Sequence, residues 1–293
     1  MKTILVPTDF SPAAFNAMKY AAALATEVKS KLLLVHILEL PVMPMESGMV
    51  LPLDGQLEDC KEELTRLTQK LKLENSTLLE IKTICQCGYF QANLCQLVRD
   101  NAVDLVVMGT RGDSNFLDKL LITTTAECIK SAICPILVVP AQANFTGIKH
   151  IALASDFENE ETVFLQQLFC LAEPLQADVS IINIVSDRQL NVYPDNQVIK
   201  DITKHFPEKS ISIAQIKKNN VIAGLQEFVQ DNQMDVLALS MHERDFFENL
   251  FHKSVSKQLI GDTQIPLLAL PEKPYLKPKP YDTTQNQALS MLN

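Results

Sequence analysis

The sequence contains two copies of one pattern, and this repeat constrains the fold more than any other feature. Four segments of the first copy recur in the same order in the second copy: Lys2–Phe10 as Lys149–Phe157, Lys31–Leu38 as Asp178–Val185, Asp104–Gly109 as Asp235–Ser240, and Cys134–Pro140 as Ile265–Pro271. The first two pairs are offset by 147 residues and the last two by 131 residues. The second copy therefore lacks about sixteen residues (147 against 131) between its second and fourth strands. The proline- and methionine-rich loop Pro41–Gln56 is the candidate for this surplus in the first copy.

Within each copy, short apolar runs alternate with segments of helical spacing. The apolar runs lack polar alternation, which is typical of parallel strands that are covered on both faces. The first helical segment begins with Ser11 at the N-cap and Pro12 at the first helical position. This order predicts an α/β fold, with two tandem doubly wound domains that each hold a five-stranded parallel sheet. Ligands of such sheets bind beyond the carboxyl ends of the strands.

Length and composition limit the classes of protein to which this chain can belong. A chain of 293 residues is long enough for two domains, which we place at 1–142 and 147–272, followed by an extended tail at 273–293. A net charge of −9 argues against nucleic acid as a partner. No run approaches the roughly 18 apolar residues that a membrane helix needs. The seven cysteines are irregularly spaced and do not form a secreted disulfide framework, so we expect a cytoplasmic protein without a membrane association.

The segment after the fourth strand of the first copy could hold a phosphate group. Gly109 and Gly112 lack Cβ atoms, so their backbone N–H groups can approach an anion closely. Thr123 and Thr124 follow near an expected helix N-terminus, where free N–H groups and the helix dipole favour phosphate. Two glycines after a strand are a weak signal alone, and a turn that serves geometry only is the alternative.

These segments together resemble the universal stress protein (UspA-like) family, over nearly all of residues 1–140 and more faintly over 149–272. The resemblance implies an adenine nucleotide α-hydrolase-like fold and, in ATP-binding members, the motif Gly-x2-Gly-x9-Gly-(Ser/Thr). It implies binding of ATP or another adenine nucleotide, with Mg²⁺ as a possible companion. The nucleotide-binding residues that it implies are Thr8, Asp9, Ile37, Met108, Gly109, Arg111, Gly112, Thr123 and Thr124. Asp9 would lie beside the ribose and adenine, the backbone around Ile37 would meet the adenine edge, and Met108 and Arg111 would flank the phosphates.

The sequence departs from this motif in both copies. Ile122 stands where the third motif glycine belongs, and a β-branched side chain there could block the outer phosphates. In the second copy Ser240 and Glu243 replace the two glycines, and the Glu243 carboxylate would repel a phosphate. Asp156 survives opposite Asp9. We therefore expect nucleotide binding in the first copy only.

Cysteine and histidine residues give no second site. Cys85 and Cys87 could together hold a metal ion, but no further ligands accompany them, so we expect no metal site and interpret them as small buried hydrophobes. An exposed, oxidisable Cys85 or Cys87 is the alternative. His36, inside an apolar strand, is more often a core histidine than a base, while His242 and His252 could contact a ligand or partner. No nucleophile and base pair can be named, so no catalytic residue is assigned.

The sequence thus predicts a stress-response regulatory or protective protein that binds an adenine nucleotide. The resemblance implies that the two copies pair as a pseudo-dimer through their last strands, with a homodimer possible and the protein partners unknown. Two alternatives stay open: an interaction or scaffold protein that binds no nucleotide, and an enzyme that hydrolyses ATP or transfers an adenylyl group.

Overall fold

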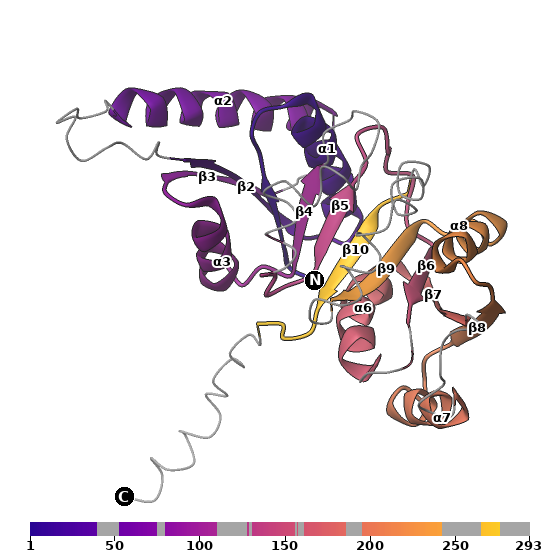
Figure 1. Cartoon of the computed structure of the whole chain (residues 1–293). Coiled ribbons are helices and arrows are strands. Elements are labelled where there is room, and N and C mark those ends of the chain that lie inside the picture. The colour runs from indigo at the N-terminus through magenta and orange to yellow at the C-terminus, as the bar shows by residue number, and fades with distance from the viewer. Residues whose placement is uncertain are drawn as a thin grey trace, which may run out of the picture.

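The computed structural model describes residues 1–39, 53–74, 80–109, 128, 131–155, 157, 161–185, 195–241 and 265–275. Within these residues the chain forms a ten-stranded sheet with helices on both faces (Figure 1). The elements of the first half are β1 (Thr3–Pro7), α1 (Pro12–Glu27), β2 (Lys31–Leu38), α2 (Leu53–Glu74), β3 (Ile81–Cys87), α3 (Phe90–Asp100), β4 (Leu105–Gly109) and β5 (Ile136–Val139). Those of the second half are β6 (His150–Ala154), α6 (Glu161–Leu175), β7 (Asp178–Val185), α7 (Asp195–His205), β8 (Ile211–Lys217), α8 (Val221–Asp231), β9 (Val236–Met241) and β10 (Leu267–Pro271).

The order of the strands in the sheet corresponds to the repeat in the sequence. Across the sheet the strands run β3-β2-β1-β4-β5-β10-β9-β6-β7-β8. From its outer edge to the middle of the sheet, the second half has the order β8-β7-β6-β9-β10, which matches β3-β2-β1-β4-β5 of the first half. Among the described strands every neighbouring pair is parallel except β5 and β10, which pair antiparallel in the middle of the sheet. The prediction of an α/β fold built on parallel strands is confirmed. The five strands of each half do not stand apart but continue into one sheet.

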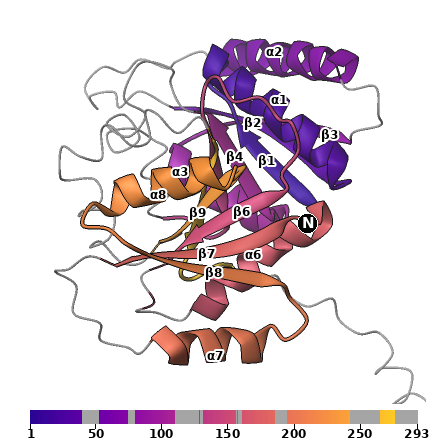
Figure 2. The same ribbon diagram turned by 90° about the vertical axis from the view of Figure 1, so that its right-hand side faces the viewer.

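Two apolar clusters fill the two sides of the sheet. One cluster contains Ile4, Val6, Leu32 and Leu34 of the sheet together with side chains of α1, α2, α6 and α7. The other contains the alternate strand residues, such as Leu5 and Val35, together with side chains of α3 and α8. Because successive strand residues point to opposite faces, uninterrupted apolar strands can feed both clusters. Figure 2 shows α1 and α2 close together beside the strands of the first half.

Helix α1 begins as the sequence predicts. The Ser11 hydroxyl accepts a hydrogen bond from the Ala14 N–H (3.2 Å) and caps the helix, and Pro12 is its first residue. The capped first turn fixes where α1 leaves the carboxyl end of β1.

Helix α2 differs from the prediction in its length. It begins at Leu53, inside the segment Pro41–Gln56 that the sequence suggests is a loop. It has 22 residues, against 11 for its counterpart α7. Much of the length difference between the two copies therefore lies in a helix, which a count of missing residues cannot distinguish from a loop.

One carboxylate in each half joins the start of the sheet in the same way. Asp104 Oδ2 accepts hydrogen bonds from the backbone N–H groups of Lys2 (2.7 Å) and Thr3 (2.9 Å). Asp235 Oδ2 accepts equivalent bonds from Lys149 (2.6 Å) and His150 (2.9 Å) in the second half. The repeat therefore extends to side-chain interactions that fix the first strand of each half against the fourth.

Tyr20 of α1 gives the fold a predicted sensitivity to alkaline pH. Its side chain is buried and meets the Phe145 ring edge-on, with centroids 5.1 Å apart. Burial, with smaller contributions from the charges of Asp235 and Glu27, raises the pKa of Tyr20 well above its usual value. A raised pKa means that the neutral phenol is favoured in the folded state. Its contribution to stability is therefore complete below about pH 10 and is lost as the pH rises above that value.

We expect Tyr20→Phe to flatten the fall in unfolding free energy between about pH 9 and pH 11. Urea unfolding at several pH values measures this slope. Tyr89→Phe is the matched control, because the Tyr89 side chain is 77% exposed and the substitution should leave the slope unchanged. Equal slopes in the wild type and Tyr20→Phe would contradict the prediction.

Candidate functional site

The turn after β1 places a carboxylate at the carboxyl end of the sheet. The Thr8 N–H still donates to the Val35 carbonyl of β2 (2.8 Å), and the buried Thr8 Oγ1 accepts from the Phe10 N–H (3.0 Å). Asp9 is exposed, and its Oδ1 accepts from the Ser11 N–H (3.0 Å). Phe10 has a positive φ of 62°, which bends the chain sharply into α1. These bonds hold Asp9 at the mouth of the site.

Beside this turn, β2 continues beyond the end of β1. The β1–β2 register ends at the pair Pro7–Val35, so among the described residues Ile37 has no partner in β1. In a parallel ladder the peptide groups of alternate residues point to the same neighbouring strand. Because the Val35 carbonyl faces β1, the N–H and C=O groups of Ile37 face that side too. The sheet thus presents a donor and an acceptor next to Asp9.

The end of β4 lies on the other side of β1. The β1–β4 register pairs Ile4 with Leu105 and Leu5 with Val106, and its continuation places Thr8 beside Gly109. The chain passes from β1 to β2 on one side and returns to β4 on the other, which makes this boundary the topological switch point of the half. The buried Met108 and the half-buried Gly109 end β4 there.

Gly109 is required by packing as well as by any ligand. A Cβ atom at this position would lie 2.5 Å from the Ala13 carbonyl oxygen and 2.8 Å from the Ala13 carbonyl carbon. The first turn of α1 therefore passes directly against the end of β4, and only glycine leaves room for it. The sequence suggested phosphate approach or a turn as the reason for this glycine, and the structure adds a third reason, its packing against α1.

His36 is a site neighbour whose position the sequence did not reveal. Its Nδ1 lies 2.6 Å from the Thr8 carbonyl oxygen, and its ring packs on Phe10 with centroids 4.4 Å apart. The imidazole thus joins β2 to the turn that carries Asp9. The sequence interpretation as a core histidine missed this contact because it depends on the positive φ of Phe10, which no local pattern announces.

Five of the predicted site residues lie at the adjoining ends of β1, β2 and β4: Thr8, Asp9, Ile37, Met108 and Gly109. The other four, Arg111, Gly112, Thr123 and Thr124, lie outside the described residues, as does Ile122. The described part of the site therefore contains the residues expected at the base and the ribose, together with Met108 and Gly109 at the start of the predicted phosphate loop. The rest of that loop stays a prediction.

The equivalent place in the second half has a different chemistry. The turn is repeated: the Ser155 N–H donates to Ile182 O (3.0 Å), Ser155 Oγ accepts from the Phe157 N–H (3.0 Å), and Phe157 has a φ of 59°. Ser155 Oγ also donates to the carboxylate of Glu161, which is 3% exposed at the start of α6. A buried carboxylate at this helix N-terminus occupies the position that favours an anion. Helix α6 corresponds to α1 and not to the segment after β9 that would match the predicted phosphate loop, so the carboxylate adds negative charge beside the end of β6 and disfavours an anionic ligand there. Asp156, Glu243, His242 and His252 lie outside the described residues.

Asn183 takes the place of His36 in the second half. Its Nδ2 donates to the Ser155 carbonyl oxygen (2.9 Å), as His36 meets that of Thr8, and its Oδ1 accepts from Gln215 Nε2 (3.1 Å). Asn183 is 4% exposed. The second half therefore joins β7 to the turn after β6 through a buried amide, where the first half uses an imidazole.

The cysteines require one correction. Cys60 of α2 and Cys85 of β3 form a disulfide, with their Cα atoms 6.4 Å apart, whereas the sequence favoured Cys85 as a packed thiol. A separation of 25 residues carries no information about distance in the fold, so the pairing could not be found from spacing. Cys87, which follows on the same strand, is half-buried.

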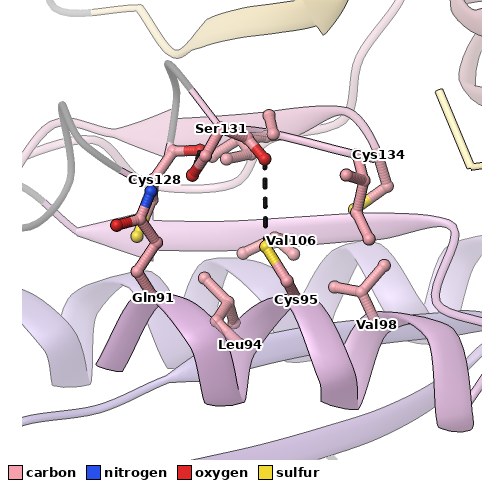
Figure 3. A pocket seen from close by; sticks show the side chains of 11 residues that line it. Gln91, Leu94, Cys95, Val98, Val106, Cys128, Ser131 and Cys134 are labelled. Carbon is pink, nitrogen blue, oxygen red and sulfur yellow. Dashed lines mark hydrogen bonds between the residues drawn. The ribbon is translucent and has the colours of Figure 1, made fainter. Parts of the chain in front are cut away.

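A small cavity lies on the opposite side of β4 from α1. Figure 3 shows Cys95 and Leu94 of α3 below it, with Cys128, Ser131 and Cys134 around it. Its volume is about 10 Å³, at the lower limit for one water molecule, and its wall is almost wholly apolar. The Cys95 thiol donates to the Ser131 carbonyl oxygen (3.8 Å). This cavity is a packing gap of the core and does not belong to the candidate site.

The part of the chain that the structure describes contains neither a metal-binding cluster nor a helix that could span a membrane. No three histidine, cysteine or acidic side chains gather in a way that could hold a metal ion. No described helix is both long and apolar enough to span a membrane.

Comparisons with known proteins agree with the fold. The model of the universal stress protein family matches residues 1–140. Universal stress protein MJ0577 of Methanocaldococcus jannaschii is 30% identical over an alignment of 153 residues, which covers 47% of this chain and 94% of that protein. Universal stress protein Sll1654 of Synechocystis is 31% identical over 143 residues, 47% of this chain and 85% of that protein. The chain belongs to the universal stress protein family.

A solved structure extends the similarity of fold to both halves. The crystal structure of a universal stress protein from Archaeoglobus fulgidus superposes with a TM-score of 0.66 and covers 92% of this chain and 96% of its own. The sequence identity is 13%, so this comparison concerns the fold alone. The curated relatives named above match about half of this chain in sequence.

Proposed function

We propose that the first half binds one adenine nucleotide, ATP or another, at the adjoining ends of β2, β1 and β4. The observation that carries this proposal is the end of β2 beyond Val35, which among the described residues has no strand partner on its β1 side. The N–H and C=O groups of Ile37 face a place that β1 has left, beside the exposed Asp9. An adenine edge offers a matching acceptor and donor, which is the pairing that a strand end can supply.

Each described residue has a role in this proposal. The Asp9 carboxylate would accept from the ribose hydroxyl groups, and the Ile37 peptide groups would bind the adenine edge. The end of β4 at Met108 and Gly109 would direct the chain toward the phosphates. Arg111, Gly112, Thr123 and Thr124 would hold the phosphates, and Mg²⁺, if it accompanies the nucleotide, would neutralise part of their charge. Ile122 would weaken contacts to the outermost phosphate.

We propose that the second half serves as a scaffold and does not bind the nucleotide. The buried Glu161 carboxylate and the replacement of both motif glycines, by Ser240 and Glu243, support this assignment. The halves would correspond to domains at 1–142 and 147–272 with a tail at 273–293. They would form a pseudo-dimer, supported by the antiparallel pairing of β5 with β10. Nucleotide binding would then regulate a cytoplasmic stress response through partners that recognise the loaded first half, as a single chain or a homodimer.

Two substitutions test the nucleotide proposal by calorimetric titration with ATP, ADP and AMP. Asp9→Ala should weaken all three nucleotides alike by about tenfold, because it removes charge-assisted bonds to the part that they share. Ile122→Gly should tighten ATP more than AMP, because it frees the approach to the outer phosphates.

The control is Asp231→Ala, which removes an exposed carboxylate at the end of α8, far from the site in sequence and in sheet order. It should leave the three dissociation constants unchanged. Absence of binding in both the wild type and Ile122→Gly would contradict the proposal and favour the scaffold alternative. Conversion of bound ATP to ADP or AMP during the titration would favour the enzyme alternative.

A further inference from the structure

The Cys60–Cys85 disulfide connects two elements that packing already holds together. Cys60 of α2 is 4% exposed and lies in the same apolar cluster as Leu64 and Leu71, which are 1% and 0% exposed. Cys85 belongs to β3, which pairs with β2 over seven residues. Neither element needs the bond to keep its place, so the two sulfur atoms stay close when the bond is broken.

The second half shows that this contact does not need cysteine. Helix α7 occupies the place of α2, and its Val198 and Ile202 enter the same cluster as Ile211 and Ile213 of β8. At the position of Cys85 in the register, β8 has Gln215 opposite Asn183, as Cys85 stands opposite His36. Apolar and amide side chains therefore suffice for this packing, and a pair of thiols adds a chemical capability to it.

The two sulfur atoms differ in accessibility. Cys85 is half-buried on β3, which is the edge strand of the described sheet, while Cys60 is enclosed under α2. A small oxidant can therefore reach Cys85 first, and Cys60 is placed to react only with Cys85. This division into an attacking and a resolving cysteine is characteristic of thiols that form disulfides reversibly.

We propose that Cys60 and Cys85 form a reversible redox site for hydroperoxides, in which the oxidised state fastens α2 to β3. The Cys85 thiolate attacks one peroxide oxygen, the O–O bond breaks, and the alcohol, or water from hydrogen peroxide, leaves with the proton of the thiol. Cys60 then attacks Cys85 Sγ, the S–S bond replaces the S–O bond, and water leaves with the Cys60 proton. An external dithiol reverses the reaction by two thiol–disulfide exchanges and is itself oxidised to a disulfide.

This site acts independently of nucleotide binding. The bond closes a loop of 25 residues that includes most of α2, so its formation restricts opening of that helix. Hydrogen exchange of the α2 amides between Cys60 and Leu71 should be slower by about tenfold or more in the oxidised protein than in the reduced protein. Helix α7, which has no such bond, is the control within the same molecule and should exchange equally in both states.

The first test is competition among the cysteines of the full chain. The protein is reduced with dithiothreitol without denaturant, freed of reductant, treated with one molar equivalent of hydrogen peroxide, and analysed by alkylation and peptide mass spectrometry. We expect a Cys60–Cys85 cross-linked peptide while Cys170, which is exposed, still alkylates. Oxidation of Cys170 or Cys87 ahead of the pair would overturn the proposal, as would failure of dithiothreitol to reduce the bond in the folded protein.

The second test separates the two roles by trapping sulfenic acid with dimedone after peroxide treatment. Cys60→Ala should leave Cys85 as a sulfenic acid that dimedone labels, because the resolving thiol is absent. Cys85→Ala should leave Cys60 unlabelled, because α2 encloses it. Equal labelling of the two variants would show that accessibility does not set the order of reaction and would overturn the proposed roles.

Discussion

Gly109→Val should lower the free energy of unfolding by about 3 kcal/mol, because the new side chain would collide with the first turn of α1. A Cβ atom alone would come within 2.5 Å of the Ala13 carbonyl oxygen, and backbone atoms on both sides have little freedom to move. Ser11 caps this turn, so a shift of α1 would also disturb its N-terminus. Urea unfolding followed by circular dichroism measures the loss.

Gly55→Ala is the matched control for this prediction. Gly55 lies in α2, and nothing lies within 4 Å of a Cβ atom built there. Alanine should raise the unfolding free energy by about 0.5–1 kcal/mol, because it favours the helix over the unfolded chain. A Gly109→Val protein as stable as the wild type would contradict the packing role of this glycine.

The packing role changes what a glycine substitution can reveal about the ligand. Loss of nucleotide binding in Gly109→Val would follow from a displaced α1 even if no phosphate approached Gly109. Asp9→Ala and Ile122→Gly are therefore better probes of the site, because neither change forces a side chain against α1.

Leu268→Ala should lower the unfolding free energy by about 3 kcal/mol, because it removes apolar volume at the junction between the halves. Leu268 of β10 pairs with Leu137 of β5 in the antiparallel register, and both side chains are at most 1% exposed. The sheet and its apolar clusters continue through this junction, so the wild type should unfold in one cooperative transition. Thermal and urea unfolding, followed by near- and far-ultraviolet circular dichroism, measure both expectations.

The control for the junction is Leu73→Ala, because the Leu73 side chain is 86% exposed and should contribute little. Two separate transitions in the wild type, or a Leu268→Ala protein as stable as Leu73→Ala, would show that the halves are joined without mutual stabilisation. Either result would remove the support that the β5–β10 pairing gives to the proposed pseudo-dimer.

Much of the fold could be predicted because local signals and the repeat agree. Buried strands such as Leu32–Val35 have no polar alternation, and Ser11-Pro12 marks a helix start that the structure confirms. The long α2 was predicted only from Leu57 onward, because the preceding Leu53–Gln56 adjoins a proline- and methionine-rich stretch with no helix cap. The single sheet was less accessible to prediction, since the repeat alone does not say how the halves meet.

The arrangement of the described residues at the candidate site could be predicted in part. Strand ends follow from the strand assignments, so Thr8, Asp9 and Gly109 could be grouped in advance. The contacts of His36, the buried Glu161 carboxylate and the Cys60–Cys85 bond depend on which side chains meet across elements. Such contacts are set by the register and by turns with positive φ, and a single sequence encodes neither of them locally.

The most direct test of the central claim is the stoichiometry of ATP binding to the full chain, measured by isothermal titration calorimetry with Mg²⁺ present. One nucleotide per chain is the predicted result, because the second half lacks both motif glycines and has a buried carboxylate beside the strand end that corresponds to the candidate site. Two nucleotides per chain would contradict the asymmetry between the halves, and none would contradict the assignment of a nucleotide site.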